Sequence, residues 1–129
     1  MRLLLDTHTL FWLDTDPNRL SLTALSAIRN RQHQVYVSAV TAWELAIKHR
    51  LGKLPSAAPL LDSYHASLAR YGFKELPLSS SHALAESSLS SPHKDPFDRA
   101  LVAQALLEEL RLVSNDPKVV GFVEIDVLW

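Results

Sequence analysis

The sequence predicts an α/β protein of three layers, in which a mostly parallel sheet of four to five strands lies between helices. Short apolar runs at 3–5, 35–37 and 111–114 have the length of strands. Between them lie longer segments with apolar residues at helical spacing, and this alternation is typical of parallel sheets with helices on both faces. The 129 residues, 47% of them hydrophobic, suit a single domain spanning 1–129.

Composition excludes several classes of protein. The formal net charge is −1, so binding of nucleic acid would need a local basic patch. The absence of cysteine excludes disulfides, zinc–thiolate sites and cysteine nucleophiles. No apolar run has the length of a membrane span, and the few residues before Asp6 are too short for a signal peptide. We expect a soluble, cytoplasmic protein with no membrane partner.

The first half of the chain predicts two strands and four helices. The run 3–5 is continuously apolar, which is typical of a strand buried on both faces. Pro17 ends the first helix, and Ser38 and Gly52 are the expected start and stop of the third. The expected helices cover 8–13, 21–30, 40–51 and 58–71, and the second strand covers 35–37.

The second half predicts three strands and two helices. The run 73–78 contains Pro77, which favours an edge strand, and a short helix follows through Leu84. After a polar loop at 90–96, Pro96 opens a helix in which only Gln104 is polar between positions 100 and 107, so we expect it to be buried on most sides. The last two strands are expected at 111–114 and 123–127, with one helical turn after Asn115.

Acidic residues follow two of these strands directly. Asp6 comes after the first strand and Asp116 after the strand at 111–114. Since parallel strands end at one edge of the sheet, where α/β proteins bind ligands, both carboxylates are candidates for a site. The alternative is that each is only a helix N-cap, and Pro117 in the first helical position favours a cap at Asp116.

Glu44 is the third candidate. It lies inside an expected helix between Trp43 and Leu45, which is unusual surroundings for a solvated carboxylate. The alternative is an exposed Glu44 that pairs with Lys48 one turn later.

Asp95 and Asp98 flank Pro96 and Phe97 at the start of the apolar helix. Proline favours the first helical position, which makes Asp95 the expected N-cap and Asp98 the third helical residue. Side chains of the first turn point towards the helix N-terminus, so Asp98 can reach the strand edge that carries Asp6. We therefore assign Asp95 to the cap and Asp98 to the candidate site.

Convergence of Asp6, Glu44, Asp98 and Asp116 would create strong repulsion. Each like-charged pair at a separation of ~4 Å would cost roughly 4 kcal/mol at an effective dielectric constant of 20. Such a cluster persists only if it takes up protons or divalent cations. Oxygen ligands without His or Cys favour Mg²⁺ or Mn²⁺, which serve phosphate ester chemistry.

These segments together resemble a PIN domain of the VapC type, a toxin ribonuclease of toxin–antitoxin pairs. The resemblance covers essentially the whole chain, in order and at the expected spacing. It rests on LLLDTH at 3–8, SAVTAWELAIK at 38–48, HKDPFDRALVAQA at 93–105 and LVSND at 112–116.

The resemblance implies a PIN-like fold and a site. Asp6, Glu44, Asp98 and Asp116 match the acidic residues that bind Mg²⁺ or Mn²⁺ and support cleavage of RNA in that family. Thr7 and Ser114 match hydroxyl positions beside the metals, with Ser114 where many members have Thr. His8 stands where many have Ser. Its role is open among contact with a base edge, donation to a metal ligand and packing on its own helix, of which we expect the last.

The resemblance also implies partners. We expect an RNA substrate, a small cognate antitoxin similar to VapB, and a homodimer. Lys48, His49, Arg50 and Lys53 form the one basic cluster near a candidate site residue, and they either contact RNA phosphates or are a solvated helix end. The aliphatic and aromatic surplus at Phe11, Trp12 and in 60–71 is the sequence feature that suggests the dimer.

Two other functions are consistent with the acids. A haloacid-dehalogenase-like phosphatase also begins with a strand and an Asp, but it needs a second Asp two residues later, where this chain has His8. The other is a non-catalytic binding module whose acids only cap helices. Such a module would show no strong Mn²⁺ site.

Overall fold

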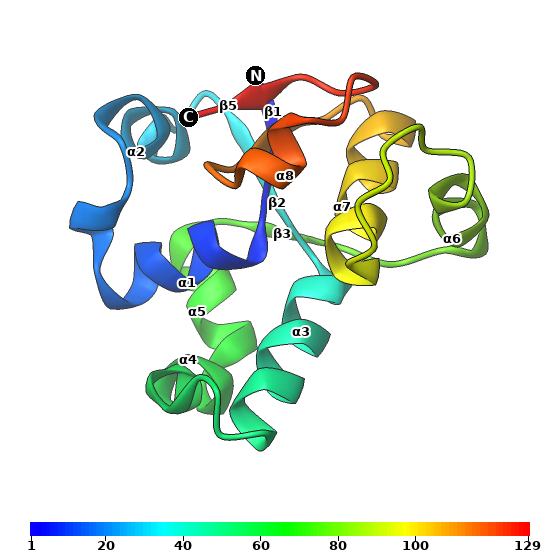
Figure 1. Cartoon of the computed structure of the whole chain (residues 1–129). Coiled ribbons are helices and arrows are strands. Elements are labelled where there is room, and N and C mark those ends of the chain that lie inside the picture. Colours follow the sequence, from blue (N-terminus) through cyan, green and yellow to red (C-terminus); the bar gives the residue numbers. More distant parts are fainter.

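The sheet has five strands, all parallel, in the order β3-β2-β1-β4-β5. The computed structural model describes residues 1–129 and is shown in Figure 1. The strands are β1 (Arg2–Leu5), β2 (Gln34–Ser38), β3 (Lys74–Leu76), β4 (Arg111–Val113) and β5 (Val127–Leu128). The expected α/β class and parallel sheet are therefore confirmed, and the strand with the following Pro77 is indeed at an edge.

Helices connect the strands and cover both faces of the sheet. They are α1 (Thr7–Thr15), α2 (Leu22–Arg29), α3 (Ala39–Arg50), α4 (Ala58–Asp62), α5 (Tyr64–Tyr71), α6 (Ser80–Glu86), α7 (Pro96–Leu107) and α8 (Pro117–Val120). Short 3₁₀ turns at Pro17–Arg19 and Pro55–Ala57 precede α2 and α4. This is the three-layer α/β/α arrangement that the alternation of segments predicts.

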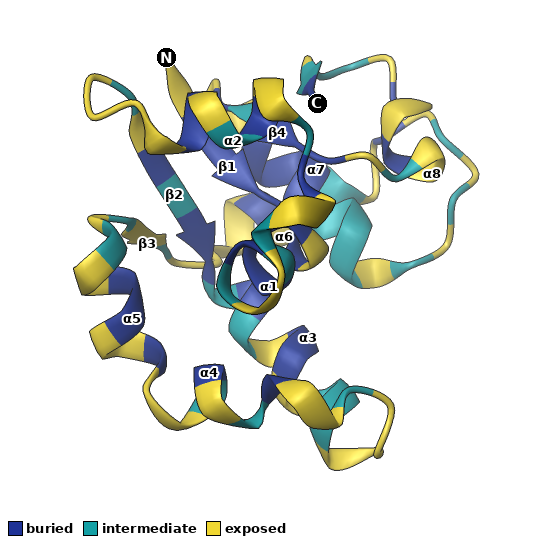
Figure 2. Cartoon of the chain, turned by 90° about the vertical axis from the view of Figure 1, so that its left-hand side faces the viewer, coloured by how far each residue is buried: buried dark blue, intermediate teal, exposed yellow.

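Strand β1 is the centre of the core. Leu3, Leu4 and Leu5 are each 0% exposed, and Figure 2 shows the strand enclosed between helices. Leu3 and Leu5 belong to a cluster with side chains of α1, α2, α4 and α5, whereas Leu4 packs with α7 and α8. Because successive strand residues point to opposite faces, this division confirms that both faces of β1 are covered.

Several expected helix ends are confirmed by their hydrogen bonds. Ser38 caps α3 by accepting a bond from the amide of Val40 at 3.0 Å. Asp95 caps α7 with Pro96 in the first helical turn. Gly52 follows the end of α3 with φ of +73°, a left-handed conformation that glycine adopts without the strain of a side chain.

Two elements differ from the prediction. The helix expected at 58–71 is broken at Ser63, whose hydroxyl donates to the carbonyl of Pro59 at 3.0 Å and whose backbone leaves the helical region. The last strand, expected at 123–127, is only Val127–Leu128. Val123 is 84% exposed and lies in a turn, so this apolar residue is not part of a strand.

No helix combines the length and the apolar character that crossing a membrane would require.

The positive φ at Gly52 predicts that alanine is tolerated less well there than at Gly121. A Cβ at Gly52 meets nothing within 4 Å, so Gly52→Ala should lower the free energy of unfolding by ~1 kcal/mol through backbone strain alone. Gly121→Ala is the matched control, since its Cβ would be in ordinary contact with two carbonyls at 3.5 and 3.7 Å. Urea unfolding of both variants checks this, and equal stabilities would contradict it.

Candidate active site

Asp6 lies buried at the carboxyl end of β1. It caps α1, since its Oδ1 accepts a hydrogen bond from the amide of Thr9 at 2.8 Å. Burial raises the pKa of Asp6, and interactions with the hydroxyl of Ser114 and with Thr9 oppose that rise. The capping alternative is therefore real, but it uses only one carboxylate oxygen.

Glu44 is held by two neighbours on different elements. Only 2% of the residue is exposed, although it also forms the predicted pair with Lys48, whose Nζ lies 2.6 Å from Oε2. The hydroxyl of Thr7 donates to the other oxygen, also at 2.6 Å. Glu44 is thus a buried carboxylate directed to the start of α1, and not the solvated one of the alternative interpretation.

Asp98 lies in the first turn of α7, as predicted, with its carboxylate against His93. The two side chains meet at 2.8 Å, from Nε2 to Oδ2. Burial raises the pKa of Asp98 to about 6, partly opposed by the hydrogen bond with His93. The charges of Asp95, Glu44 and Asp116 raise this pKa further, so these acids lie near enough to repel one another.

Asp116 and Asp95 are both N-caps. Oδ1 of Asp116 accepts from the amide of Lys118 at 2.9 Å, and Oδ1 of Asp95 accepts from the amides of Phe97 and Asp98. Capping therefore does not by itself separate Asp95 from the candidate ligands, because Asp6 and Asp116 cap as well. In each case only Oδ1 is engaged by the cap.

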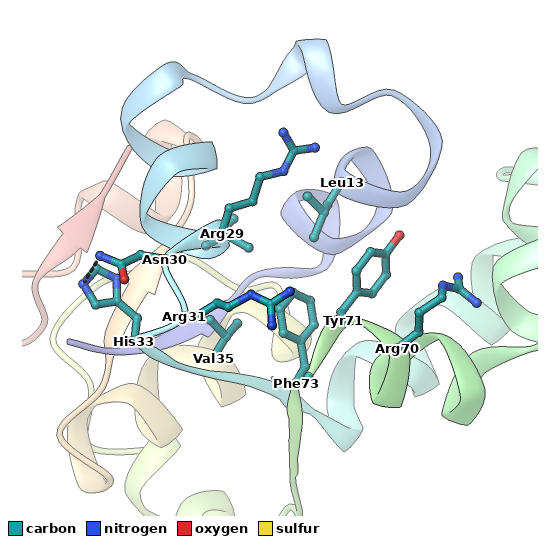
Figure 3. A pocket seen from close by; sticks show the side chains of 11 residues that line it. Leu13, Arg29, Asn30, Arg31, His33, Val35, Arg70, Tyr71 and Phe73 are labelled. Carbon is teal, nitrogen blue, oxygen red and sulfur yellow. Dashed lines mark hydrogen bonds between the residues drawn. The ribbon is translucent and has the colours of Figure 1, made fainter.

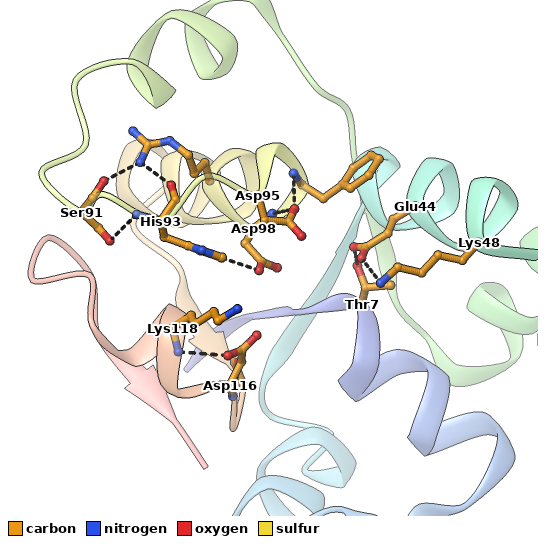
Figure 4. A network of polar contacts seen from close by, with 12 residues as sticks. Thr7, Glu44, Lys48, Ser91, His93, Asp95, Asp98, Asp116 and Lys118 are labelled. Carbon is orange, nitrogen blue, oxygen red and sulfur yellow. Dashed lines mark hydrogen bonds and ion pairs between the residues drawn. The ribbon is translucent and has the colours of Figure 1, made fainter. Parts of the chain in front are cut away.

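The candidate acids lie at the carboxyl edge of the sheet, where Asp98 is within electrostatic range of Glu44 and Asp116. Figure 4 shows Asp98 between Asp116 and the Glu44–Lys48 pair, with Thr7 beneath Glu44. Ser114 connects two of the acids, since its hydroxyl interacts with Asp6 and accepts from the amide of Asp116 at 3.1 Å. No three acidic or histidine side chains stand close enough in this arrangement to enclose one metal ion.

Arg99 organises the loop that carries His93. Its guanidinium donates to the carbonyls of Ser91 at 2.6 Å and His93 at 2.9 Å, and to the carbonyl of Glu86 at 2.8 Å; it also forms an ion pair with the Glu86 carboxylate. These bonds place His93 beside Asp98. Sequence reasoning missed His93 as part of the site, although it stands in the quoted motif at 93–105, because its position depends on the path of the loop.

The remaining predicted residues lie at different distances from this centre. Thr7 and Ser114 are buried beside the acids, as the resemblance implies. Arg50 and Lys53 are exposed at and beyond the far end of α3. His8 is exposed and lies against Trp12, with ring centroids 5.6 Å apart, which agrees with packing on its own helix.

Comparison with known protein families shows which family has this sequence. A family model described as the PIN domain matches residues 3–127, nearly the whole chain. The chain therefore belongs to the PIN domain family.

Within that family its relatives are VapC proteins. It is 32% identical over 114 residues to Ribonuclease VapC22 of Mycobacterium tuberculosis, an alignment that covers 88% of this chain and 85% of the relative. Ribonuclease VapC16 of the same organism is 31% identical over 65 residues, covering 50% of this chain and 46% of the relative.

Solved structures share the fold over the full length. The structure of VapBC2 from Rickettsia felis bound to a promoter DNA fragment has a TM-score of 0.69 at 16% identity, covering 100% of this chain and 99% of the other. FitAcB from Neisseria gonorrhoeae gives a TM-score of 0.65 at 19% identity, with coverage of 98% and 96%. At these identities the likeness concerns the fold.

The raised pKa of Asp98 predicts an unusual pH dependence. The folded state binds this proton more tightly than the unfolded state, so ionised Asp98 lowers stability as the pH rises through about 6. Asp98→Asn cannot ionise and can still accept from His93. Without metal it should be more stable than the parent by ~1–3 kcal/mol above pH ~7, with the difference vanishing near pH ~4.

Denaturant unfolding in chelator at both pH values measures this difference. Asp95→Asn is the matched control, since asparagine caps a helix about as well as aspartate. If Asp98→Asn were no more stable than the parent above pH ~7, burial would not be destabilising the ionised carboxylate.

Proposed function

We propose that this protein is an endoribonuclease that depends on Mg²⁺ or Mn²⁺ and is the toxin of a toxin–antitoxin pair. The observation that carries the proposal is the position of the candidate acids: Asp6 and Asp116 follow β1 and β4 at the carboxyl edge of the sheet, and the charges of Glu44 and Asp116 act on Asp98. The relative VapC22, which this chain matches over most of its length, is a ribonuclease by name.

The donor set suits a hard divalent cation. All four candidate ligands are carboxylates, and the chain has no cysteine. Burial raises the pKa of Asp6 and Asp98, so ionising both within this cluster calls for a compensating positive charge. Asp6, Glu44, Asp98 and Asp116 would hold the ion, and to enclose it their side chains would have to move closer together than they stand in this arrangement. When bound, it would lower the pKa of a water molecule and stabilise charge on the phosphodiester oxygens.

The chain's own residues orient these carboxylates. Thr7 and Lys48 each hold one oxygen of Glu44, and His93 holds one oxygen of Asp98. The backbone amides at the starts of α1 and α8 fix Asp6 and Asp116. Such fixed partners keep the acids in place in spite of their mutual repulsion.

An aromatic pair borders the site. Trp43 is 57% exposed and lies against Phe97, with ring centroids 5.1 Å apart and an interplanar angle of 84°. Each ring belongs to the residue next to a candidate ligand, Glu44 or Asp98. Unpaired RNA bases stack on exposed aromatic rings, which favours single-stranded or loop RNA as the substrate class.

The proposed protein partner is a small antitoxin. The solved structures with the same fold include VapBC assemblies and a toxin–antitoxin complex from Klebsiella pneumoniae. An Arg or Lys side chain of a partner would also be complementary in charge to the acidic site.

The aliphatic and aromatic surplus that suggests the dimer is largely used within one protomer. Phe11, Leu60, Tyr64 and Leu68 are buried in the protomer's own core, so they offer no surplus to a second copy. Exposed apolar side chains are found elsewhere, on Leu22, Trp43 and Leu84. The homodimer stays a prediction.

Metal dependence is the first test of the function. The purified protein, free of antitoxin, should cleave single-stranded RNA in Mg²⁺ or Mn²⁺ and stop in EDTA, with recovery when the metal is restored. Gel analysis of a labelled oligonucleotide measures this. Cleavage that survives exhaustive chelation would reject the proposed mechanism, and a lack of Mn²⁺ binding would favour acids that only cap helices.

Two neighbouring substitutions sharpen this test. Asp98→Asn keeps the size of the side chain but removes a charge that the cation needs, so cleavage should fall at least ~100-fold and Mn²⁺ binding should weaken. Asp95→Asn should keep the cap and most of the activity. Nuclease assays and metal titration on both variants distinguish them, and an inactive Asp95→Asn beside an active Asp98→Asn would reverse the assignment.

Assembly is tested separately by light scattering at micromolar concentration. We expect the mass of a dimer. A monomer throughout the concentration range would contradict the homodimer, whatever the result of the nuclease assays.

A further inference from the structure

A cavity lies at the amino-end edge of the sheet, opposite the edge that carries the acids. Its volume is about 610 Å³, and its lining comes from the end of α1, the segment from α2 to β2, and the segment from α5 to β3. Val35 and Phe73 stand at the amino ends of β2 and β3, whereas the acids follow the carboxyl ends of β1, β2 and β4. The two regions therefore share no reacting atoms.

Arginine dominates the polar lining of this cavity. Arg29, Arg31 and Arg70 all line it, and no Asp or Glu does. None of the three arginines is in an ion pair, although other basic residues of the chain pair with carboxylates. In a protein with a net charge of −1, this is a concentration of unpaired guanidinium groups around one cavity.

The other walls of the cavity are aromatic and apolar. The rings of Tyr71 and Phe73 are stacked, with centroids 5.2 Å apart and an interplanar angle of 22°. Leu13 and Val35 are buried side chains that contribute apolar surface. The nearest acid to this wall is Asp14, which accepts a hydrogen bond from the hydroxyl of Tyr71 at 2.7 Å and so fixes that ring.

The arrangement of these groups is visible in Figure 3. Leu13, Arg29, Arg31 and Tyr71 surround an open space, and Arg70 stands at its outer margin. One side of the cavity is thus cationic and another is aromatic. Guanidinium groups bind phosphate through paired N–H donors, and aromatic rings stack on nucleobases.

We propose that this cavity binds a phosphorylated nucleotide, with the phosphate on Arg29 and Arg31 and the base against Tyr71 and Phe73. The volume lies within the range of pockets that hold small ligands. The same chemistry is present in a free nucleotide and in one unpaired nucleotide of an RNA strand. This site is separate from the proposed ribonuclease site and does not depend on it.

The test uses the intact protein in chelator, so that no RNA is cleaved. AMP, inorganic phosphate and a single-stranded oligoadenylate are titrated separately, and binding is followed by ¹H–¹⁵N spectra that include the arginine side chains. We expect saturable AMP binding with shifts confined to residues around 28–35 and 70–73. Phosphate alone should bind more weakly, because it lacks the base.

Variants assign the two halves of the ligand. Arg31→Gln or Arg29→Gln should weaken AMP binding about tenfold, because a charged hydrogen bond to phosphate is lost. Tyr71→Leu should reduce the advantage of AMP over inorganic phosphate, whereas Tyr71→Phe should keep it. Arg19→Gln is the matched control, since Arg19 is exposed, lies over Trp12 and does not line the cavity.

The outcomes distinguish a free nucleotide from an RNA strand as the ligand, and either of these from the absence of a specific site. Tighter binding of oligoadenylate than of AMP, with the same residues shifted, identifies an RNA strand as the ligand; the reverse order identifies a free nucleotide. If AMP does not bind saturably, or if Arg19→Gln weakens it as much as Arg31→Gln, the proposal is wrong. Because the titrations are carried out in chelator and measure binding alone, neither result affects the ribonuclease proposal.

Discussion

The pairing of β1 with a parallel strand on each side is the constraint on which the rest of the molecule depends. Leu5 lies opposite Val37 of β2 and opposite Val113 of β4, so the three strands end at nearly the same level. The register of these strands therefore suffices to bring Asp6, the start of α3 and Ser114 next to one another. The amide of Asp6 donates to the carbonyl of Val113 at 3.1 Å, which extends this register into the site itself.

The carboxylates of the site are destabilised both by burial and by their mutual repulsion. Several carboxylates are withdrawn from water in one region, an arrangement that opposes folding unless each is compensated. The chain supplies this compensation with a lysine on Glu44, a histidine on Asp98 and backbone amides on Asp6 and Asp116. Arg99 belongs to the same compensation indirectly, because it fixes the loop that brings His93 to Asp98.

The features that depend on local patterns could be predicted from the sequence. The buried strand 3–5, the cap at Asp95 and the stop at Gly52 follow from runs, proline and glycine, and the structure confirms them. Two features could not be predicted from the periodicity of the sequence. The break at Ser63 interrupts a pattern that reads as one helix, and His93 joins the site only through the path of its loop. Neither event leaves a periodic signal in the residues themselves.

The outermost strands are very short, β3 with three residues and β5 with two. A sheet edge exposes unpaired amide and carbonyl groups, which in longer strands recruit another chain and lead to aggregation. Here each edge offers too little backbone for a stable intermolecular ladder. Copies that meet at high concentration, as when the chain is produced in excess, must therefore associate through helices and side chains, which leaves the central sheet unaltered.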